Sequence, residues 1–220
     1  MSKESDRISS DVACLDTKNL PATLIATQGA HCVVWQSGGY RHPGTGVTID
    51  LVVKRHSLDC SPQEMRLYHR DYLKLKSRLN EIIPTAIFVR TLIDGRENLL
   101  VMARAHVPWF NIANPANEEE AMPLLARLPK ARLQLQTFVD AAREWQFRES
   151  KIIDLYGIDN LILDKEYEVR YLDSFEVFFH EDLLHLIDQP GEDLEEKIAI
   201  SLRRLEYLEY LLEHCCPGPR

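Results

Sequence analysis

The sequence predicts an α+β protein, in which a first part built from β-strands around one helix precedes a mainly helical part. Three observations support this prediction. Two β-like stretches of the first part flank a loop rich in Gly and Pro at residues 37–46, a pattern typical of a hairpin. From Ser61, apolar residues recur in steps of three and four, as on one face of a helix. Two long amphipathic segments, residues 128–147 and 182–216, follow in the second half.

The first part divides into a tail and a candidate lobe. Residues 1–22 are polar and aperiodic, and we expect a flexible tail there. Residues 23–105 form the candidate N-terminal lobe. Its helix should begin at Ser61, because Ser61, Pro62 and Glu64 follow the order of a capping box with Pro at the first helical position. The apolar face of that helix consists of Met65, Tyr68, Tyr72, Leu75 and Leu79.

A second hairpin is expected after this helix. The stretches PTAIFVRTLI and ENLLVMARA are both typical of strands, and the dipeptide Asp94-Gly95 lies between them. Asp-Gly is a strong signal for a tight hairpin turn, since both residues accept a positive φ. The order of elements in this part is therefore β-β-α-β-β.

Residues 106–220 form the candidate C-terminal lobe. Residues 111–123 contain several Pro and Asn-Pro positions and a run of Glu, which indicates a linker or lip. The helix at 128–147 follows, and then the apolar stretches NLILD and VRYLDSF flank the polar sequence DKEYE, which predicts a small hairpin. The helix at 182–216 ends at Pro-Gly-Pro.

Composition excludes several classes of protein. Lys and Arg number 26 against 34 Asp and Glu, a net charge of −8, so the basic surface that nucleic-acid binding needs is missing. No apolar stretch approaches the roughly 18 residues of a membrane span, and the N-terminal residues lack the apolar stretch of a secretory signal. Five cysteines without a CxxC pair are typical of reduced thiols. We therefore expect a cytoplasmic protein without a transmembrane segment.

Asn160 and Asp173 are the most informative pair of polar residues. They lie 13 positions apart, on the two apolar stretches of the small predicted hairpin. In this context DNLIL resembles the end of the catalytic loop of the kinase-like fold, H-R-D-x-x-x-x-N, and LDSF resembles its D-F-G motif. The resemblance implies that Asn160 and Asp173 hold Mg²⁺, which bridges the phosphates of ATP. Without the resemblance, they are two ordinary polar residues of a hairpin.

The first part extends the resemblance to the nucleotide site. Lys54 is similar to the lysine of the third strand that contacts the phosphates, and Glu64 to the helix glutamate that pairs with it. Met102, in ENLLVMARA, lies on the strand that resembles the one leading to the adenine-binding hinge. Gly29 matches the middle glycine of the Gly-rich loop, but Thr27 and Cys32 replace the other two. Glu64 also has a structural alternative as a capping-box residue.

The catalytic base is where the sequence departs from the family. The base Asp should lie five positions before Asn160, where this chain has Leu155, and Asp154 precedes it. We predict that a loop with one inserted residue bulges at Gly157, with positive φ, and so returns Asp154 to the catalytic position. Without the bulge, Leu155 would face the pocket. The sequence also lacks the usual His-Arg before this Asp.

The resemblance is greatest to small bacterial kinase-like proteins, such as the YrbL-like family and the lipopolysaccharide core heptose kinases. Only 47 residues follow Asp173, too few for the usual peptide-binding helices. The first hypothesis is therefore an ATP- and Mg²⁺-dependent phosphotransferase that acts on a small-molecule, sugar or lipid-linked glycan hydroxyl. The second is a pseudokinase, a regulatory module that binds a protein partner. The third is an α+β interaction domain without nucleotide.

Overall fold

The computed structural model describes residues 22–26, 32–41, 48–180 and 192–215. It shows an α+β protein that divides into two compact units. The first unit comprises Met1–Met65 and Ala86–Ala105, and the second comprises Arg66–Thr85 and His106–Arg220. Residues 1–21 of the expected tail and Gly29 lie outside the described residues, whereas Ala22, expected in the tail, already begins the first strand. In the described part of the chain, no helix is both long and apolar enough to cross a membrane.

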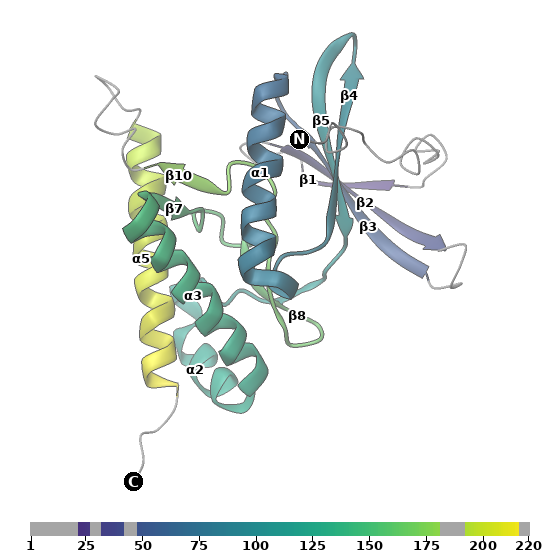
Figure 1. Ribbon diagram of the computed structural model, residues 1–220. Coiled ribbons are helices and arrows are strands. Elements are labelled where there is room, and N and C mark those ends of the chain that lie inside the picture. The colour runs from purple at the N-terminus through teal and green to yellow at the C-terminus, as the bar shows by residue number, and fades with distance from the viewer. Residues whose placement is uncertain (1–21, 27–31, 42–47, 181–191, 216–220) are drawn as a thin grey trace. The chain divides into compact units, whose positions relative to one another are not determined.

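The first unit is a five-stranded antiparallel sheet with the strand order β1-β2-β3-β5-β4 (Figure 1). Its strands are β1 (Ala22–Ala26), β2 (Cys32–Arg41), β3 (Thr48–His56), β4 (Ala86–Ile93) and β5 (Arg96–Arg104). The predicted turn between β4 and β5 is confirmed, because Asp94 and Gly95 have φ values of 51° and 78°. Positive φ at both central positions matches the right-handed twist of the two strands.

Strand β2 corrects one expectation. Residues 37–41 were expected to belong to a loop, but β2 continues through Gly38 and Gly39 to Arg41. The pairing of β2 with β3 shifts register between Ser37 and Tyr40. The two glycines therefore belong to a β-bulge rather than a turn, a common role for glycine inside a strand.

Helix α1 (Pro62–Leu79) begins as the sequence predicts. The Ser61 amide donates to Glu64 Oε2 at 2.7 Å, and the Glu64 amide donates to Ser61 Oγ at 3.3 Å, which completes the capping box. The predicted apolar face is buried: it consists of Met65, Tyr68, Tyr72, Leu75 and Leu79. From Arg66 onward the helix belongs to the second unit.

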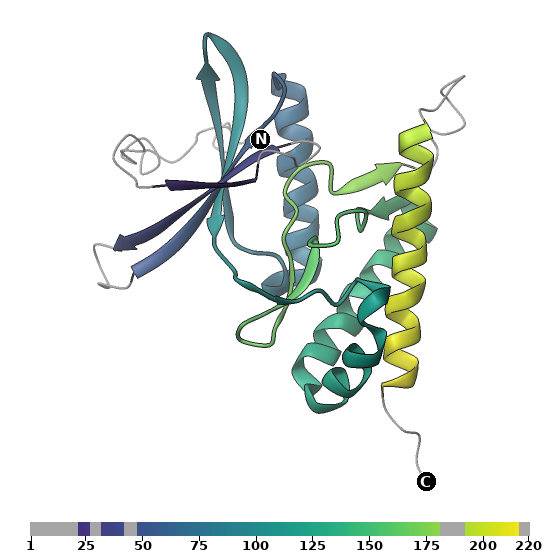
Figure 2. The same cartoon turned by 180° about the vertical axis from the view of Figure 1, so that it is seen from behind.

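Helices α2 (Glu118–Arg127), α3 (Pro129–Glu149) and α5 (Glu192–His214) pack on one another in the second unit (Figure 2). Helix α3 confirms the predicted amphipathic segment. The linker expected at 111–123 is wrong in its second half, where α2 forms. Three Glu residues in the first turn favour a helix there, because they complement the positive end of the helix dipole. Burial of Ala121 and Leu125 offsets the hydrogen bond that Pro123 cannot donate.

Short strands complete the second unit. They are β6 (Pro108–Phe110), β7 (Lys151–Ile153), β8 (Leu161–Asp164), β9 (Val169–Tyr171) and β10 (Phe178–His180). Strands β8 and β9 form the predicted small hairpin, with β6 on the other side of β8, and β10 pairs with β7. All residues of β8 are buried. The hairpin therefore lies in the core of the unit, and side chains at its ends are held on a rigid base.

Candidate functional site

Asn160 and Asp173 meet at the open end of the β8–β9 hairpin. The Leu172 amide donates to the Asn160 carbonyl at 2.8 Å, which extends the pairing of the two strands by one step. The Asn160 side chain turns toward both neighbours. Its Nδ2 donates to the backbone carbonyl of Asp154 at 3.2 Å and lies 3.5 Å from Asp173 Oδ2. The structure thus brings the three predicted residues of this region together.

Asp154 is buried beside Asp173. Its Oδ1 accepts the Tyr156 amide hydrogen at 2.7 Å, and its carboxyl group is close enough to the Asp173 carboxyl group for the two to interact electrostatically. Burial, followed by the negative charge of Asp173, raises the pKa of Asp154 to about 7. The negative charge of Asp173 therefore makes it harder for Asp154 to lose its proton than it is for an exposed aspartate.

The backbone around the pair is firmly held. The Asp154 amide donates to Val177 O at 2.9 Å, and the Tyr171 hydroxyl donates to the Asp154 carbonyl at 3.0 Å. Asp173 Oδ1 accepts the amide of Ser174 at 2.6 Å. Each carboxyl group therefore uses one oxygen to fix its own position, and the second oxygen of Asp173 lies beside Asn160 Nδ2.

Leu155, at the position of the family base, is fully buried. Its amide donates to Ser201 Oγ of α5 at 3.1 Å, and the Arg204 guanidinium donates to the Leu155 and Tyr156 carbonyls. The Leu155 side chain is therefore part of the core, and the carboxyl group of Asp154 is the one that faces Asp173.

The predicted positive φ at Gly157 is wrong, since Gly95 is the only glycine with positive φ among the described residues. Gly157 is needed for space instead. A Cβ there would lie 2.8 Å from Asn160 Cγ, closer than real Cβ contacts allow. The Asn160 amide also donates to the Gly157 carbonyl at 3.1 Å, so residues 157–160 form a tight turn that accommodates the extra residue of the loop.

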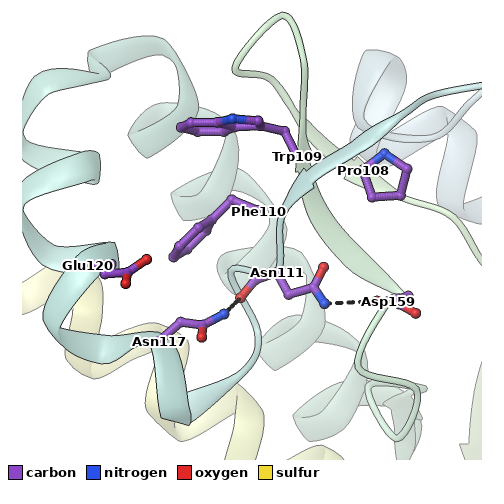
Figure 3. Close-up of a pocket in the computed structure, with 7 residues that line it drawn as sticks. All are labelled: Pro108, Trp109, Phe110, Asn111, Asn117, Glu120 and Asp159. Carbon is purple, nitrogen blue, oxygen red and sulfur yellow. Dashed lines mark hydrogen bonds between the residues drawn. The ribbon is translucent and has the colours of Figure 1, made fainter.

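A pocket of about 490 Å³ borders the same turn (Figure 3). Its lining comes from β6, the start of α2 and the turn itself, and consists of Pro108, Trp109, Phe110, Asn111, Asn117, Glu120 and Asp159. Sequence reasoning did not identify this pocket, because its residues come from two distant segments that no motif connects.

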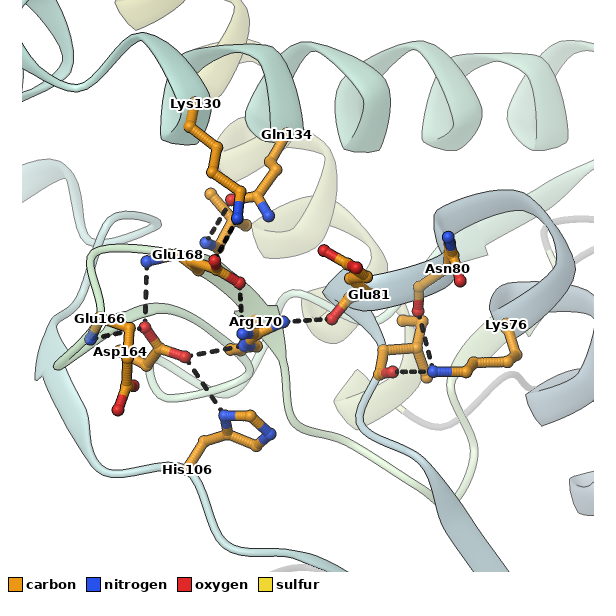
Figure 4. Close-up of polar contacts among 12 residues, drawn as sticks. Lys76, Asn80, Glu81, His106, Lys130, Gln134, Asp164, Glu166, Glu168 and Arg170 are labelled. Atoms are coloured by element: carbon orange, nitrogen blue, oxygen red, sulfur yellow. Dashed lines mark hydrogen bonds and ion pairs between the residues drawn. The ribbon is translucent and has the colours of Figure 1, made fainter.

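Sequence reasoning also missed a network that braces the hairpin at its closed end (Figure 4). Asp164, which is fully buried, accepts the Arg170 Nε hydrogen at 2.7 Å, and its other oxygen accepts the amides of Glu166 and Glu168. His106 Nδ1 lies 3.2 Å from Asp164 Oδ2. Burial alone would raise the pKa of Asp164, but these hydrogen bonds and the Arg170 charge hold it below its usual value.

The predicted residues of the first unit that the structure describes lie on different elements. Lys54 is half-buried on β3, paired with Val34 and Val101. Met102 is buried on β5. Hydrogen bonding with the Ser61 side chain and with the Ser61 amide lowers the Glu64 pKa, and among the described residues the Glu64 carboxylate forms no ion pair with Lys54.

The three residues around the β8–β9 hairpin suit a hard cation, with one rearrangement. Mg²⁺ binds oxygen ligands, which the Asp173 carboxyl group and the Asn160 side-chain oxygen can provide. Asn160 presents its amide nitrogen to Asp173, so its oxygen reaches a cation only if the amide turns over, a change that needs little extra volume. Within the described residues, no cluster of three or more His, Cys, Asp or Glu side chains suits a metal ion. A cation here would therefore be held by the Asp173 carboxylate and the Asn160 amide oxygen, with its remaining ligands from water or the nucleotide.

Comparison with models of protein families finds no match for this chain, and comparison with curated proteins finds none either. The function must therefore be argued from the site alone.

Proposed function

We propose that the protein is a phosphotransferase of the kinase-like fold, which uses ATP and Mg²⁺ to phosphorylate a hydroxyl group of a small molecule, sugar or lipid-linked glycan. The observation that carries the proposal is the contact between Asp154, Asn160 and Asp173, which meet although 19 positions separate the first from the last. In the kinase-like fold, phosphoryl transfer uses a catalytic Asp, then an Asn and then a second Asp that hold the metal, and Asp154, Asn160 and Asp173 follow each other in this order along the chain.

Each residue has a role that its surroundings support. Mg²⁺, when bound, would neutralise the charge of the nucleotide phosphates, and Asp173 and Asn160 would hold it. Asp154 would orient the acceptor hydroxyl and accept its proton. A carboxyl group with a pKa of about 7 is suited to that step, since a base works best when its pKa lies near the working pH. Lys54, on the third strand, would contact the phosphates, with Gly29 and Met102 as further nucleotide contacts.

A second candidate, the pseudokinase, is favoured by the position of Glu64. The capping box holds this carboxylate at Ser61, whereas an active kinase needs it beside Lys54. In that case, the protein would bind nucleotide or a protein partner without transferring phosphate.

Thermal unfolding with ATP, with and without Mg²⁺, tests both candidates. At a hundredfold excess over Kd, a ligand of the folded state adds about 2.7 kcal/mol, or about 5–10 °C in Tm for a chain of this length. Asp173→Asn keeps the side-chain oxygen that accepts the Ser174 amide and should abolish only the Mg²⁺-dependent part. Asp140→Asn, at an exposed site on α3, is the matched control and should respond like the parent protein.

An unchanged Tm in every mixture would reject both nucleotide-binding candidates. If ATP with Mg²⁺ raises Tm, turnover separates them. The phosphotransferase releases ADP in the presence of an acceptor and loses this activity in Asp154→Asn, whereas a pseudokinase binds without turnover.

A further inference from the structure

The pocket beside the 157–160 turn is lined by aromatic side chains and by polar ones. Trp109 and Phe110 project from β6, and Glu120 of α2 and Asp159 of the turn border the same hollow (Figure 3). At about 490 Å³, the hollow is within the range of small-molecule sites. Aromatic surface on one side and a few polar groups on the other is the usual composition of such sites.

The polar groups of the pocket mostly accept hydrogen bonds. Asn111 Nδ2 already donates to Asp159 Oδ1 at 2.8 Å, and Asn117 Nδ2 donates to the Asn111 carbonyl at 3.1 Å. Within the described part of the chain, neither the second oxygen of Asp159 nor the Glu120 carboxylate receives a hydrogen bond. The pocket thus offers oxygens to a ligand that is rich in donors.

The charge of the residues that line the pocket indicates the charge of the ligand. Two carboxylates line the pocket, and the residues that border it include no Lys, Arg or His. Three Glu residues in the first turn of α2 also offset the positive end of that helix, which would otherwise attract an anion. A phosphate or carboxylate ligand is therefore disfavoured, and a cation is favoured.

Trp109 adds an exposed aromatic surface to the pocket. The residue is 46% exposed although Tyr167 packs against its ring, edge to face, with the ring centroids 4.7 Å apart. This contact fixes the indole without covering it. The face of an indole ring attracts ammonium groups more strongly than any other side-chain ring does.

We propose that this pocket binds an organic cation, a ligand with a protonated or quaternary amine beside an apolar face. The binding site is independent of the phosphotransferase assignment. Only one extension rests on the proposed function: because Asp159 adjoins Asn160, the bound amine would then belong to the acceptor, an amino alcohol or an amino sugar.

Binding is measured without nucleotide, so that the result does not depend on whether the protein is a phosphotransferase. The probes are tetramethylammonium, spermidine and glucosamine, titrated by calorimetry at about pH 6, where exposed carboxylates are ionised. Glucose, which carries a hydroxyl in place of the amine of glucosamine, is the neutral control, and glucose 6-phosphate is the anionic one. We expect at least one amine to bind, and glucosamine to bind about tenfold tighter than glucose.

Variants assign the binding to this pocket. Trp109→Ala should weaken the binding of the amine by about tenfold, and Glu120→Gln or Asp159→Asn by roughly two- to fivefold. Glu119→Gln, the neighbouring exposed residue that does not line the pocket, should have no effect and serves as the matched control. No binding by any of the three amines, tighter binding of glucose or glucose 6-phosphate, or equal losses in Glu119→Gln would overturn the proposal.

Discussion

Replacing Asp154 with Asn should stabilise the metal-free protein at neutral pH, although changes at a buried polar group usually destabilise. The amide oxygen of Asn can still accept the Tyr156 amide hydrogen, as Asp154 Oδ1 does at 2.7 Å. On the other side, the amide nitrogen of Asn can donate to the Asp173 carboxylate. In the parent protein, Asp154 must instead either keep its proton or be repelled by the negative charge of Asp173. The substitution therefore removes an unfavourable interaction and keeps the shape of the site.

The raised pKa of Asp154 determines the pH range in which Asp154→Asn stabilises the protein. Below about pH 4, folded and unfolded chains both hold the proton of Asp154, and its carboxyl group costs no stability. As the pH rises from about 4 to about 7, the unfolded chain releases the proton and the folded chain keeps it, so the parent protein loses stability progressively. Asn has no proton to release. The advantage of Asp154→Asn should therefore grow across this window and level off above it.

The rise from 3.8 to about 7 corresponds to about 4 kcal/mol, at about 1.4 kcal/mol for each pKa unit. A buried amide retains part of the desolvation cost, so we expect about 1–3 kcal/mol in practice. For a chain of this length, that is a rise of roughly 3–10 °C in Tm.

The assay is thermal unfolding of both proteins from about pH 4 to 8 in buffer with a chelator. Asp164→Asn is the matched control, because Asp164 is also buried but its pKa is lowered. This control should be destabilised at neutral pH, and its deficit should shrink as the pH falls toward the folded-state pKa. Equal Tm values for Asp154→Asn and parent across the range, or a loss at pH 8, would refute the repulsion argument.

Two further predictions concern glycines and the helix cap. Gly157→Ala should cost about 1–3 kcal/mol of stability and weaken any Mg²⁺-dependent binding, because the new Cβ displaces Asn160. Gly95→Ala, whose Cβ would meet nothing within 4 Å, should cost only about 1–2 kcal/mol of backbone strain and leave binding unchanged; equal binding losses in both would contradict this role of Gly157. Ser61→Ala should cost about 0.5–2 kcal/mol in a denaturation experiment, and an unchanged stability would contradict the capping role of the Ser61–Glu64 pair.

The features that the sequence predicts well are those that local chemistry determines. The capping box at Ser61 and the turn at Asp94-Gly95 involve only neighbouring residues, so their side chains carry the whole signal. The sequence did not predict helix α2, because proline residues and a run of Glu are equally typical of a loop. The burial of Leu125, which stabilises the helix, depends on contacts that form only in the folded protein.

The candidate site was predictable in its residues but not in its environment. Family resemblance pointed to Asp154, Asn160 and Asp173, whereas the burial of Asp154 and its raised pKa depend on residues farther along the chain, such as Asp173. Asp164 was missed for a related reason. In the sequence it belongs to a polar stretch that resembles an exposed turn, and its partners Arg170 and His106 become neighbours only in the fold.

The negative charge of Asp173 beside the buried Asp154 carboxyl group raises the pKa of Asp154, and perturbed carboxyl pairs of this kind are typical of binding and catalytic sites. Structural carboxylates in the core are paired with cations, as Asp164 is with Arg170, whereas strained carboxyl pairs gather at sites that bind or react. A double-mutant cycle measures whether the strain lies in this pair. If it does, Asp154→Asn and Asp173→Asn each relieve the same repulsion.

The double variant should therefore gain less than the sum of the two single gains, by about 0.5–3 kcal/mol, the usual range for coupled neighbours. The cycle is measured at pH 8 and repeated at about pH 4, where protonation of Asp154 removes the repulsion and the coupling should nearly disappear. Additive gains at pH 8 would place the cost in the burial of Asp154 alone, and the carboxyl pair would then lose its value as a sign of a binding site.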